Sequence, residues 1–269
     1  MTPRAVLAAP IVLVLALLGA GCTGKDTATP VADPAASRTT ADSAPAATTP
    51  TAAPSGSAPA WREAAALSAE QLTAALLPGT ELPAGSTTEP YSTAHDAATT
   101  TLYETAAKAY PACAPVLAVL SETPSARAGV LYVTGNNVLG NRTAVDLASF
   151  PPGRVRERFD ALKAAVHGGC TQFRVRSDGP TFTVRSAAAD VAGIPAVAFT
   201  CTTPTGAVTS PGGITRTVLY AAAGDNRLLF ALTDDTALHP VLRADLVNAQ
   251  VNRFLAATGS PVPSAPAAG

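Results

Sequence analysis

The sequence predicts an α+β fold, a single globular domain in which helices pack mainly on one face of an antiparallel β-sheet. Two observations lead to this fold class. Short segments that alternate apolar and polar residues, as strands do, are joined by turns rich in Gly, Asn and Asp, which favour antiparallel pairs. Amphipathic segments with helical spacing come before, between and after these strands. We place the domain at residues 61–258 of the 269-residue chain.

The first 21 residues are typical of an export signal rather than of a folded segment. Arg4 supplies a positive start, and the nearly continuous apolar run Ala5–Leu18 is short for a membrane span. The run ends in Gly19-Ala20-Gly21-Cys22, which resembles the lipobox of bacterial lipoproteins, although a branched apolar residue is usual where Gly19 stands. The resemblance implies that residues 1–21 are a cleaved lipoprotein signal peptide and that Cys22 carries acyl chains such as palmitate. A soluble secreted product and an uncleaved anchor are the alternatives.

Residues 22–60 and the tail, residues 259–269, are predicted to be disordered. Both are rich in Ala, Pro, Ser and Gly, and they bury too little apolar surface to offset the conformational entropy lost on folding. As a flexible coil the linker reaches roughly 30 to 40 Å. Several acyl chains on one cysteine bind a membrane firmly, at about 0.8 kcal/mol per buried methylene. We therefore expect the domain to be lipid-anchored on the extracytoplasmic face of the cell membrane.

Four helical segments are predicted inside the domain. Ser68-Ala69-Glu70-Gln71 fits a capping box, and the short helix that it starts ends at Pro78-Gly79. The second segment is interrupted by Pro111 and Pro115, and the third stops at Gly168-Gly169. The later segments span Tyr103–Leu120 in pieces, Arg154–His167 and Pro240–Ala257.

Seven strands are predicted, several of them as hairpins. A Gly/Asn-rich connection joins the first two, and the turns Asp178-Gly179-Pro180 and Gly224-Asp225-Asn226 join two later pairs. The strands span Gly129–Thr134, Thr143–Phe150, Phe173–Arg176, Phe182–Arg185, Ala196–Thr202, Thr215–Ala222 and Arg227–Thr233.

This layout resembles a known family, the extracellular sensor domain of PknH-type actinobacterial serine/threonine kinases and of related standalone lipoproteins. The resemblance is carried by Leu67–Leu72, the Pro-flanked Cys113, the helix Arg158–Leu162 ending before Cys170, and the strands around Cys201. It implies a helix-backed antiparallel sheet, a cleft for an extracellular ligand and two disulfides. Because the chain has no kinase signature, it implies only the sensing or binding role.

The cysteines allow one disulfide in the domain. If Cys22 is lipidated, three thiols remain outside the cytoplasm, enough for one bridge with one thiol left over. We favour Cys113–Cys170, because both lie at the ends of helical segments and the resemblance pairs the equivalent positions. Cys201 is then a buried free thiol, a reactive thiol or half of an intermolecular bridge. The strand around Phe230-Ala231-Leu232 lacks the cysteine that the family pattern would pair with Cys201.

No catalytic motif stands out, so we expect neither an enzyme nor a bound cofactor or metal. Nucleophile elbows, Ser-x-x-Lys, His-Glu-x-x-His and phosphate-loop motifs do not occur, and His95, His167 and His239 are scattered along the chain. Asp234-Asp235 is read as a turn or helix start rather than as a metal site. With 18 basic and 19 acidic residues, the chain lacks the positive charge that a nucleic-acid partner would require.

Three arginines are the candidate ligand-binding residues. Period-two spacing puts Arg174 and Arg176 on one sheet face, and Arg185 on the neighbouring strand joins them across the hairpin. Guanidinium groups suit phosphate or carboxylate, so an anionic envelope molecule or a lipid headgroup fits this surface; the plain alternative is a solvated face.

The sequence therefore predicts a non-catalytic, lipid-tethered module that binds or senses an extracytoplasmic ligand. Its partners would be the membrane, through the anchor, and an unknown envelope ligand or protein. A carrier of a hydrophobic envelope lipid would instead contain a large apolar cavity. A hydrolase with an unrecognised site would bring a nucleophile and a base together in a cleft.

Overall fold

A computed structural model describes residues 61–91, 97–134, 141–189, 191, 193–204, 213–234 and 241–260. All of them belong to one compact unit, Pro54–Gly269. The predictions for Cys22, for the signal peptide and for the linker lie outside the described residues. No helix in the described ranges is long and apolar enough to cross a membrane.

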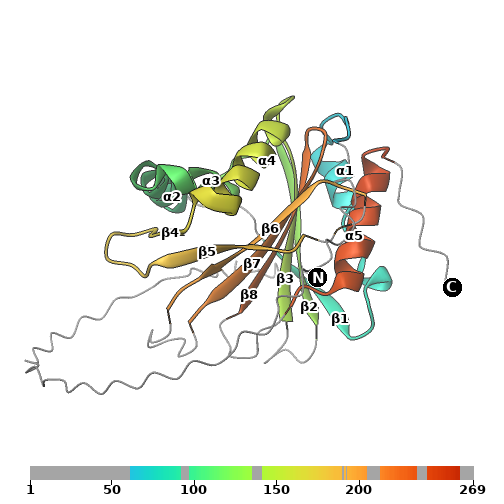
Figure 1. Ribbon diagram of the computed structural model, residues 1–269. Helices are drawn as coiled ribbons and strands as arrows, with labels where there is room; N and C mark the ends of the chain where they lie inside the picture. Colours follow the sequence, from blue (N-terminus) through green and yellow to red (C-terminus); the bar gives the residue numbers. More distant parts are fainter. Residues whose placement is uncertain are drawn as a thin grey trace, which may run out of the picture. The chain divides into compact units, whose positions relative to one another are not determined.

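One antiparallel sheet of eight strands runs through the domain in the order β1-β2-β3-β8-β7-β6-β5-β4 (Figure 1). The α+β class and the single antiparallel sheet confirm the prediction. The strands are β1 Ser86–Pro90, β2 Ala126–Thr134, β3 Asn141–Ser149, β4 Gln172–Phe173, β5 Phe182–Ala187, β6 Ala196–Thr202, β7 Thr215–Ala223 and β8 Asn226–Asp234.

Helices cover both faces of this sheet (Figure 1). Three lie over one face, here called the α2–α4 face, and two lie over the other, the α1–α5 face. We expected the helices mainly on one face. Both faces of the sheet are apolar, and each forms a separate hydrophobic core with the helices that pack on it. The helices are α1 Ala69–Ala74, α2 Ala97–Ala109, α3 Ala114–Ser121, α4 Arg154–Ala164 and α5 Ala244–Ala257.

Local sequence signals explain where the helices begin and end. Ser68 and Gln71 form the predicted capping box of α1. The turn η2, Pro111–Cys113, separates α2 from α3, as the prolines predicted. A short π-turn, η3 Ala165–Gly169, closes α4. At the end of α5 the backbone N–H of Ser260 donates to the carbonyl of Leu255, so the first residues of the predicted tail cap this helix.

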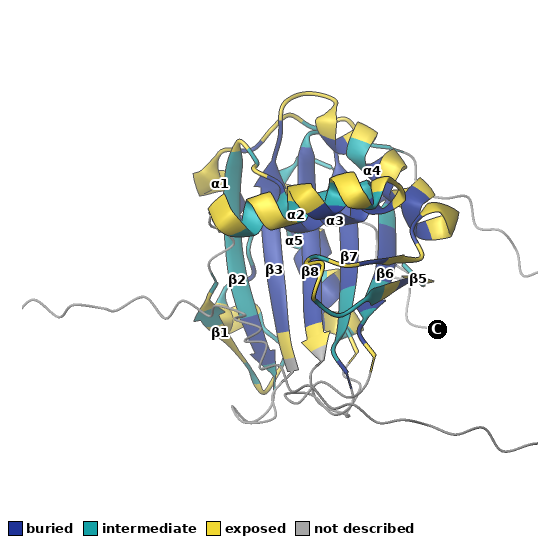
Figure 2. Cartoon of the chain, turned by 90° about the vertical axis from the view of Figure 1, so that its left-hand side faces the viewer, coloured by how far each residue is buried: buried dark blue, intermediate teal, exposed yellow. Residues whose placement is uncertain are grey.

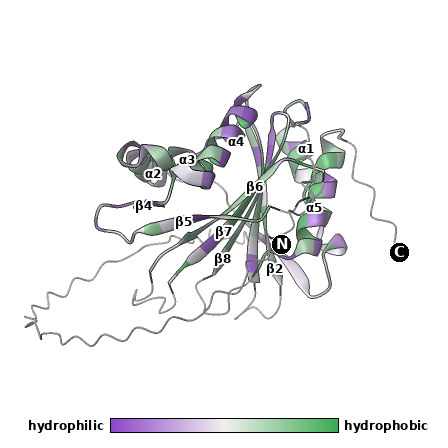
Figure 3. Cartoon of the chain, in the orientation of Figure 1, coloured by the Kyte–Doolittle hydropathy of each residue, from purple (hydrophilic) through white to green (hydrophobic). Residues whose placement is uncertain are grey.

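The two cores are built from alternate residues of the same strands. On the α2–α4 face, Val155, Phe159 and Leu162 of α4 pack with Phe199 of β6 and Tyr220 of β7. Figure 3 shows the apolar strands between the helical layers, with hydrophilic residues on the outer side of α4. The predicted disulfide Cys113–Cys170 is present and joins η2 to the end of η3.

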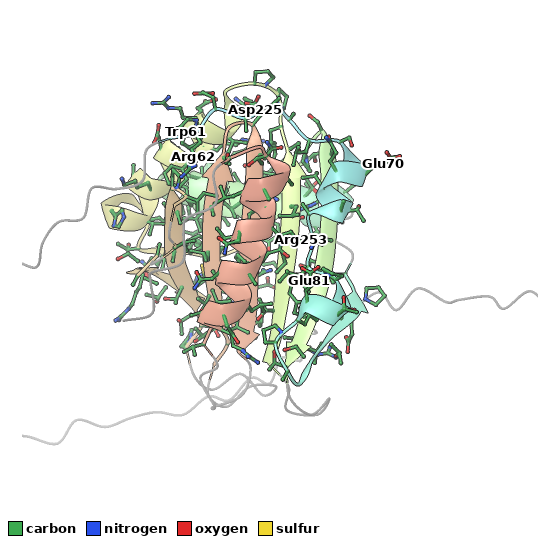
Figure 4. All side chains as sticks on the ribbon, turned by 90° about the vertical axis from the view of Figure 1, so that its right-hand side faces the viewer. Trp61, Arg62, Glu70, Glu81, Asp225 and Arg253 are labelled. Atoms are coloured by element: carbon green, nitrogen blue, oxygen red, sulfur yellow. A yellow bond between two sulfur atoms is a disulfide. The ribbon has the colours of Figure 1, made fainter. Side chains whose placement is uncertain are left out.

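On the α1–α5 face, buried polar groups bind the helices to the sheet. Gln250 of α5 accepts a hydrogen bond from the Tyr132 hydroxyl at 2.9 Å and from the Leu77 backbone N–H at 3.0 Å. Arg253 pairs with Glu81 of the turn η1, Gly79–Glu81, at 2.8 Å, and the two lie side by side in Figure 4.

The chain enters the domain through a strap, residues 61–67, laid over the β7–β8 turn. The backbone N–H of Gly224 donates to the carbonyl of Arg62 at 2.7 Å, and that of Asp225 to Ala64 at 2.9 Å. The Trp61 ring packs edge-on against Phe159, with centroids 5.8 Å apart. Figure 4 shows Trp61 and Arg62 near Asp225 at this end of the sheet. The described part of the chain therefore begins beside α4.

Candidate ligand-binding site

A cluster of buried charged side chains lies on the α2–α4 face of the sheet, next to the end of α3. Arg227 of β8 is fully buried and donates through Nη2 to Asp146 of β3 and through Nη1 to Glu122, 2.8 Å away. Glu122 caps the end of α3. One arginine thus joins a helix end to two neighbouring strands.

Two further arginines surround this cluster. Arg127 of β2 holds both oxygens of Asp146, at 2.8 and 3.1 Å, and Arg158 of α4 lies 3.0 Å from Glu122. The Phe150 ring lies beneath the guanidinium groups of Arg158, at 4.8 Å, and Arg227, at 5.3 Å. Three guanidinium groups therefore face two carboxylates, and the cluster carries an excess of positive charge.

Burial and neighbouring charges shift the pKa values of two groups in this cluster, Glu122 and Arg227. Burial raises the pKa of the Glu122 carboxyl, and the positive charges of Arg227 and Arg158 oppose that shift. Burial alone would lower the pKa of Arg227, but the charges of Asp146 and Glu122 outweigh it and raise this pKa, so the guanidinium stays charged.

A small cavity adjoins the cluster on the α2–α4 face. Its volume is about 20 Å³, room for about one water molecule. In Figure 2 helices α2 and α3 cross the strands and leave the lower parts of β3, β8 and β7 uncovered by a helix. The cavity is lined by Tyr91, Val119, Leu120, Arg127, Ala144, Asp146, Arg216, Leu229 and Ala231.

Arg216 is the residue in this lining whose charge is not matched by a carboxylate among the described residues. It lies on β7 opposite Cys201 of β6 and Thr233 of β8. Val218 and Tyr220, two and four residues on, belong to the core of the α2–α4 face, so period-two spacing puts Arg216 on that face. Its Nε is buried and has no hydrogen-bond partner in the described part of the chain.

Tyr103 and Cys201 lie within the electrostatic reach of Arg216. Burial raises the pKa of the Tyr103 hydroxyl, and the charge of Arg216 opposes the shift. Burial likewise raises the pKa of the Cys201 thiol to about 12, again against the charge of Arg216. Cys201 is a free, buried cysteine, in agreement with the first of the three predicted possibilities. Because the thiolate is the reactive form, Cys201 is a poor nucleophile at neutral pH.

The structure places Arg174 and Arg176 in a loop rather than on a strand, because β4 ends at Phe173. Arg174 Nε donates to the Thr181 hydroxyl at 2.8 Å, and Arg176 Nε donates to Asp178 at 3.2 Å. Local side-chain bonds and the turn that follows end the strand pairing here, so the period-two argument for this pair was wrong. Both side chains are exposed.

Arg185 lies on β5, as predicted, but apart from the other two. Phe173 pairs with Phe182, so Arg174 lies opposite Thr181, and Arg185 is four residues further along. At about 3.3 Å per residue this is roughly 13 Å. Its neighbour Val184 faces the α2–α4 core, so Arg185 faces the opposite side of the sheet. The three arginines do not form one cluster.

The remaining candidates form no constellation in the described ranges. His167 is exposed in η3, whereas His95, His239 and Asp235 lie outside the described residues. No group of three metal-ligating side chains occurs among the residues described.

Sequence reasoning missed Arg216 and the whole charge cluster. The signal was present on β8, where Arg227 shares its period-two face with Leu229 and Ala231, which are apolar. A charged residue on an apolar strand face indicates a buried ion pair or a site. Arg216 stands in the same relation to Val218 and Tyr220 on β7.

The chain matches no family model and no curated protein. One similar solved structure is the extracellular domain of PknH from Mycobacterium tuberculosis, 12% identical, covering 72% of this chain and 98% of that one with a TM-score of 0.40. Another is an uncharacterized protein of Mycobacterium smegmatis, the Rv0999 ortholog, 14% identical, covering 66% of this chain and 77% of that one with a TM-score of 0.28. Both are distant likenesses.

Proposed function

We propose that this protein is a non-catalytic, extracytoplasmic module that binds or senses a ligand and is anchored to the cell membrane through acyl chains on Cys22. The observation that carries the binding role is the cavity on the α2–α4 face, where the charge of Arg216 is unmatched in the described residues beside apolar side chains. Binding sites combine apolar walls with a few such polar groups.

The disulfide supports the extracytoplasmic location. Cys113–Cys170 joins two segments 57 residues apart, and such structural disulfides persist in oxidising compartments. The apolar run that ends at Cys22 and the Ala/Pro-rich linker fit export and tethering. Residues 61–67, which are hydrogen-bonded to the β7–β8 turn, fit the role of a junction between such a tether and the domain.

The two alternatives receive less support. A carrier that encloses a lipid needs an enclosed cavity of several hundred Å³. The cavity beside Arg216 has about 20 Å³, and the larger hollow of about 440 Å³ along α1 is open to solvent. A hydrolase needs a nucleophile activated by a base, and the buried thiol of Cys201, with its pKa raised to about 12, is not activated.

Native mass spectrometry of the full chain, extracted from membranes in mild detergent, tests the binding role. We expect a population heavier than the lipidated protein by the mass of one non-covalently bound molecule, which is lost on collisional activation. A spectrum that contains only the ligand-free mass, together with an unchanged melting temperature in envelope extract, would contradict the proposal.

A further inference from the structure

Helix α2 is held on the domain by few buried side chains. One of its 13 residues is buried, Ala106, whereas the shorter α4 buries three residues and α5 buries six. In Figures 1 and 2 α2 lies outside α3, further from the sheet, and its outer side is exposed. Most of the stability of a helix in a protein comes from the apolar face that it packs on the rest of the domain. Helix α2 therefore has less of this support than α4 or α5.

The sequence of α2 adds little helical stability of its own. Its first half contains three consecutive threonines, Thr99–Thr101, and threonine has a low helix propensity. The Thr101 hydroxyl donates to the carbonyl of Ala97 at 2.8 Å, a bond to the preceding turn of the kind that slightly destabilises helices. Neither packing nor propensity therefore holds α2 firmly in place.

The segment that follows α2 is fixed, in contrast to the helix. Tyr110 has a non-helical backbone, with φ −127° and ψ 71°, and Pro111 then starts η2. Because proline has no backbone N–H, it cannot continue the hydrogen bonding of α2. The turn η2 is joined to η3 by the disulfide Cys113–Cys170. Movement of α2 can therefore end at Tyr110 and leave η2 and α3 where they are.

Tyr103 is the residue through which α2 reaches the deeper part of the α2–α4 face. It packs against the core that contains Cys201, and its hydroxyl lies in the electrostatic range of the Cys201 thiol and of the Arg216 guanidinium. Cys201 is 3% exposed. Exposing polar groups such as these to water costs less free energy than exposing an apolar core of the same area. The polar groups near Tyr103 therefore lower the free energy needed to lift α2.

We propose that α2 is a lid, which detaches from the domain as far as Tyr110 while the disulfide holds η2, and exposes Cys201 to solvent. A detached helix of 13 residues is marginal in water, so the open lid loses its helical structure. The opening is local, because the sheet, α3 and α4 remain folded. It goes beyond the proposed binding function and does not depend on it, since α2 opens and closes without a ligand. In the open state the part of the α2–α4 face under Tyr103 becomes accessible from outside.

Alkylation of Cys201 in the full chain measures this opening, because a buried thiol reacts only while it is exposed. Iodoacetamide is added at several urea concentrations below the unfolding transition, and mass spectrometry of the peptide that contains Cys201 gives the rate. We expect a rate without urea about tenfold or more above the rate that global unfolding allows. This rate should change little with urea, because a local opening exposes little surface. A rate that follows the free energy of global unfolding at every urea concentration would overturn the lid.

Two neighbouring substitutions distinguish the inner from the outer side of α2. Tyr103→Ala removes the inner contact and should accelerate alkylation of Cys201 about tenfold or more. Leu102→Ala is the matched control, because Leu102 is 37% exposed, and it should leave the rate within about twofold of the parent. Equal acceleration by the two variants would overturn the lid.

Hydrogen exchange separates a local opening from a loss of global stability. In Tyr103→Ala we expect faster exchange of the backbone N–H groups of α2 and unchanged exchange in β8. Faster exchange in both elements would show global unfolding and would overturn the lid. If Tyr103→Ala does not fold, Thr101→Ala decides: a higher helix propensity should slow alkylation about two- to threefold, and an unchanged rate would overturn the proposal.

Discussion

Nη1 of Arg227 lies 2.8 Å from Oε2 of Glu122, although the two residues are 105 positions apart in the chain. This contact fixes the end of α3 against β8, and α3 forms one side of the cavity through Val119 and Leu120. The buried cluster therefore determines where the helix stands relative to Arg216.

Replacing Arg227 by Met should destabilise the fold strongly. The substitution leaves two buried carboxylates with one guanidinium partner fewer each, and breaking a buried ion pair in this way costs about 3 to 5 kcal/mol. Urea unfolding of both proteins measures the difference. Arg154→Met is the control, because Arg154 forms an exposed pair with Glu157 and should change the free energy of unfolding by less than about 0.5 kcal/mol. Equal effects of the two substitutions would show that the cluster does not hold the helix.

The disulfide should contribute about 4 kcal/mol to stability. Cys113 and Cys170 are 57 residues apart, and closing a loop of this length reduces the entropy of the unfolded chain by that amount in the chain-entropy model. The double variant Cys113→Ser, Cys170→Ser should melt well below the parent in a thermal scan. A melting temperature within a degree or two of the parent would refute this role.

Gly224 should be intolerant of a side chain because of the strap. Its φ is +56°, and an added Cβ would lie 2.1 Å from the carbonyl oxygen of Ala64. Gly85 is the matched control, since its φ is +77° but no atom lies within 4 Å of an added Cβ. Gly224→Ala should therefore lower the free energy of unfolding more than Gly85→Ala does. Gly85→Ala introduces backbone strain alone, at about 1 kcal/mol. Hydrogen exchange at the backbone N–H groups of Gly224 and Asp225 should also accelerate in the first variant, and similar losses in the two variants would argue against a close strap.

Cys201 should resist alkylation in the folded protein. In a Cys22→Ser variant it is the cysteine left outside the disulfide, and burial raises the pKa of its thiol to about 12, against about 8.5 for a free thiol. At pH 9 iodoacetamide should react at least ~100-fold faster with the urea-unfolded chain than with the folded one.

The same thiol gives stability a pH dependence with a defined sign. Because the folded state keeps the Cys201 proton to higher pH than the unfolded state does, its contribution is complete below about pH 8.5 and is lost as the pH rises toward 12. Cys201→Val should flatten the dependence of the free energy of unfolding on pH over this range. A native thiol that reacts as fast as the unfolded one would contradict the burial.

Elements with local signals were predictable from the sequence. The capping box of Ser68 and Gln71 lies within one turn, and the strand Ala196–Thr202 has its own apolar run and ends at turns. Strand β1, Ser86–Pro90, was missed because Ser, Thr, Thr, Glu and Pro show no apolar alternation; it forms by pairing with β2 at the edge of the sheet.

The candidate site was not predictable by the same reasoning. Arg227 meets Asp146 and Glu122 only after β3 pairs with β8 and α3 folds onto the sheet, contacts between residues 81 and 105 positions apart. The exposed arginines Arg174 and Arg176 were predicted as a site because they alternate in sequence. Arg216 is identified by its position in the lining of the cavity. The apolar strand faces that carry Arg216 and Arg227 mark both as candidates for burial, but the groups that they meet are decided by packing between distant segments.

The anchor on Cys22 is tested most directly by metabolic labelling with an alkyne analogue of palmitate. In cells that produce the full chain, we predict label in the protein and recovery in the membrane fraction, and neither in a Cys22→Ala variant. Finding the parent chain unlabelled in the cytosol with Met1 in place would contradict the account of a membrane-tethered extracytoplasmic module.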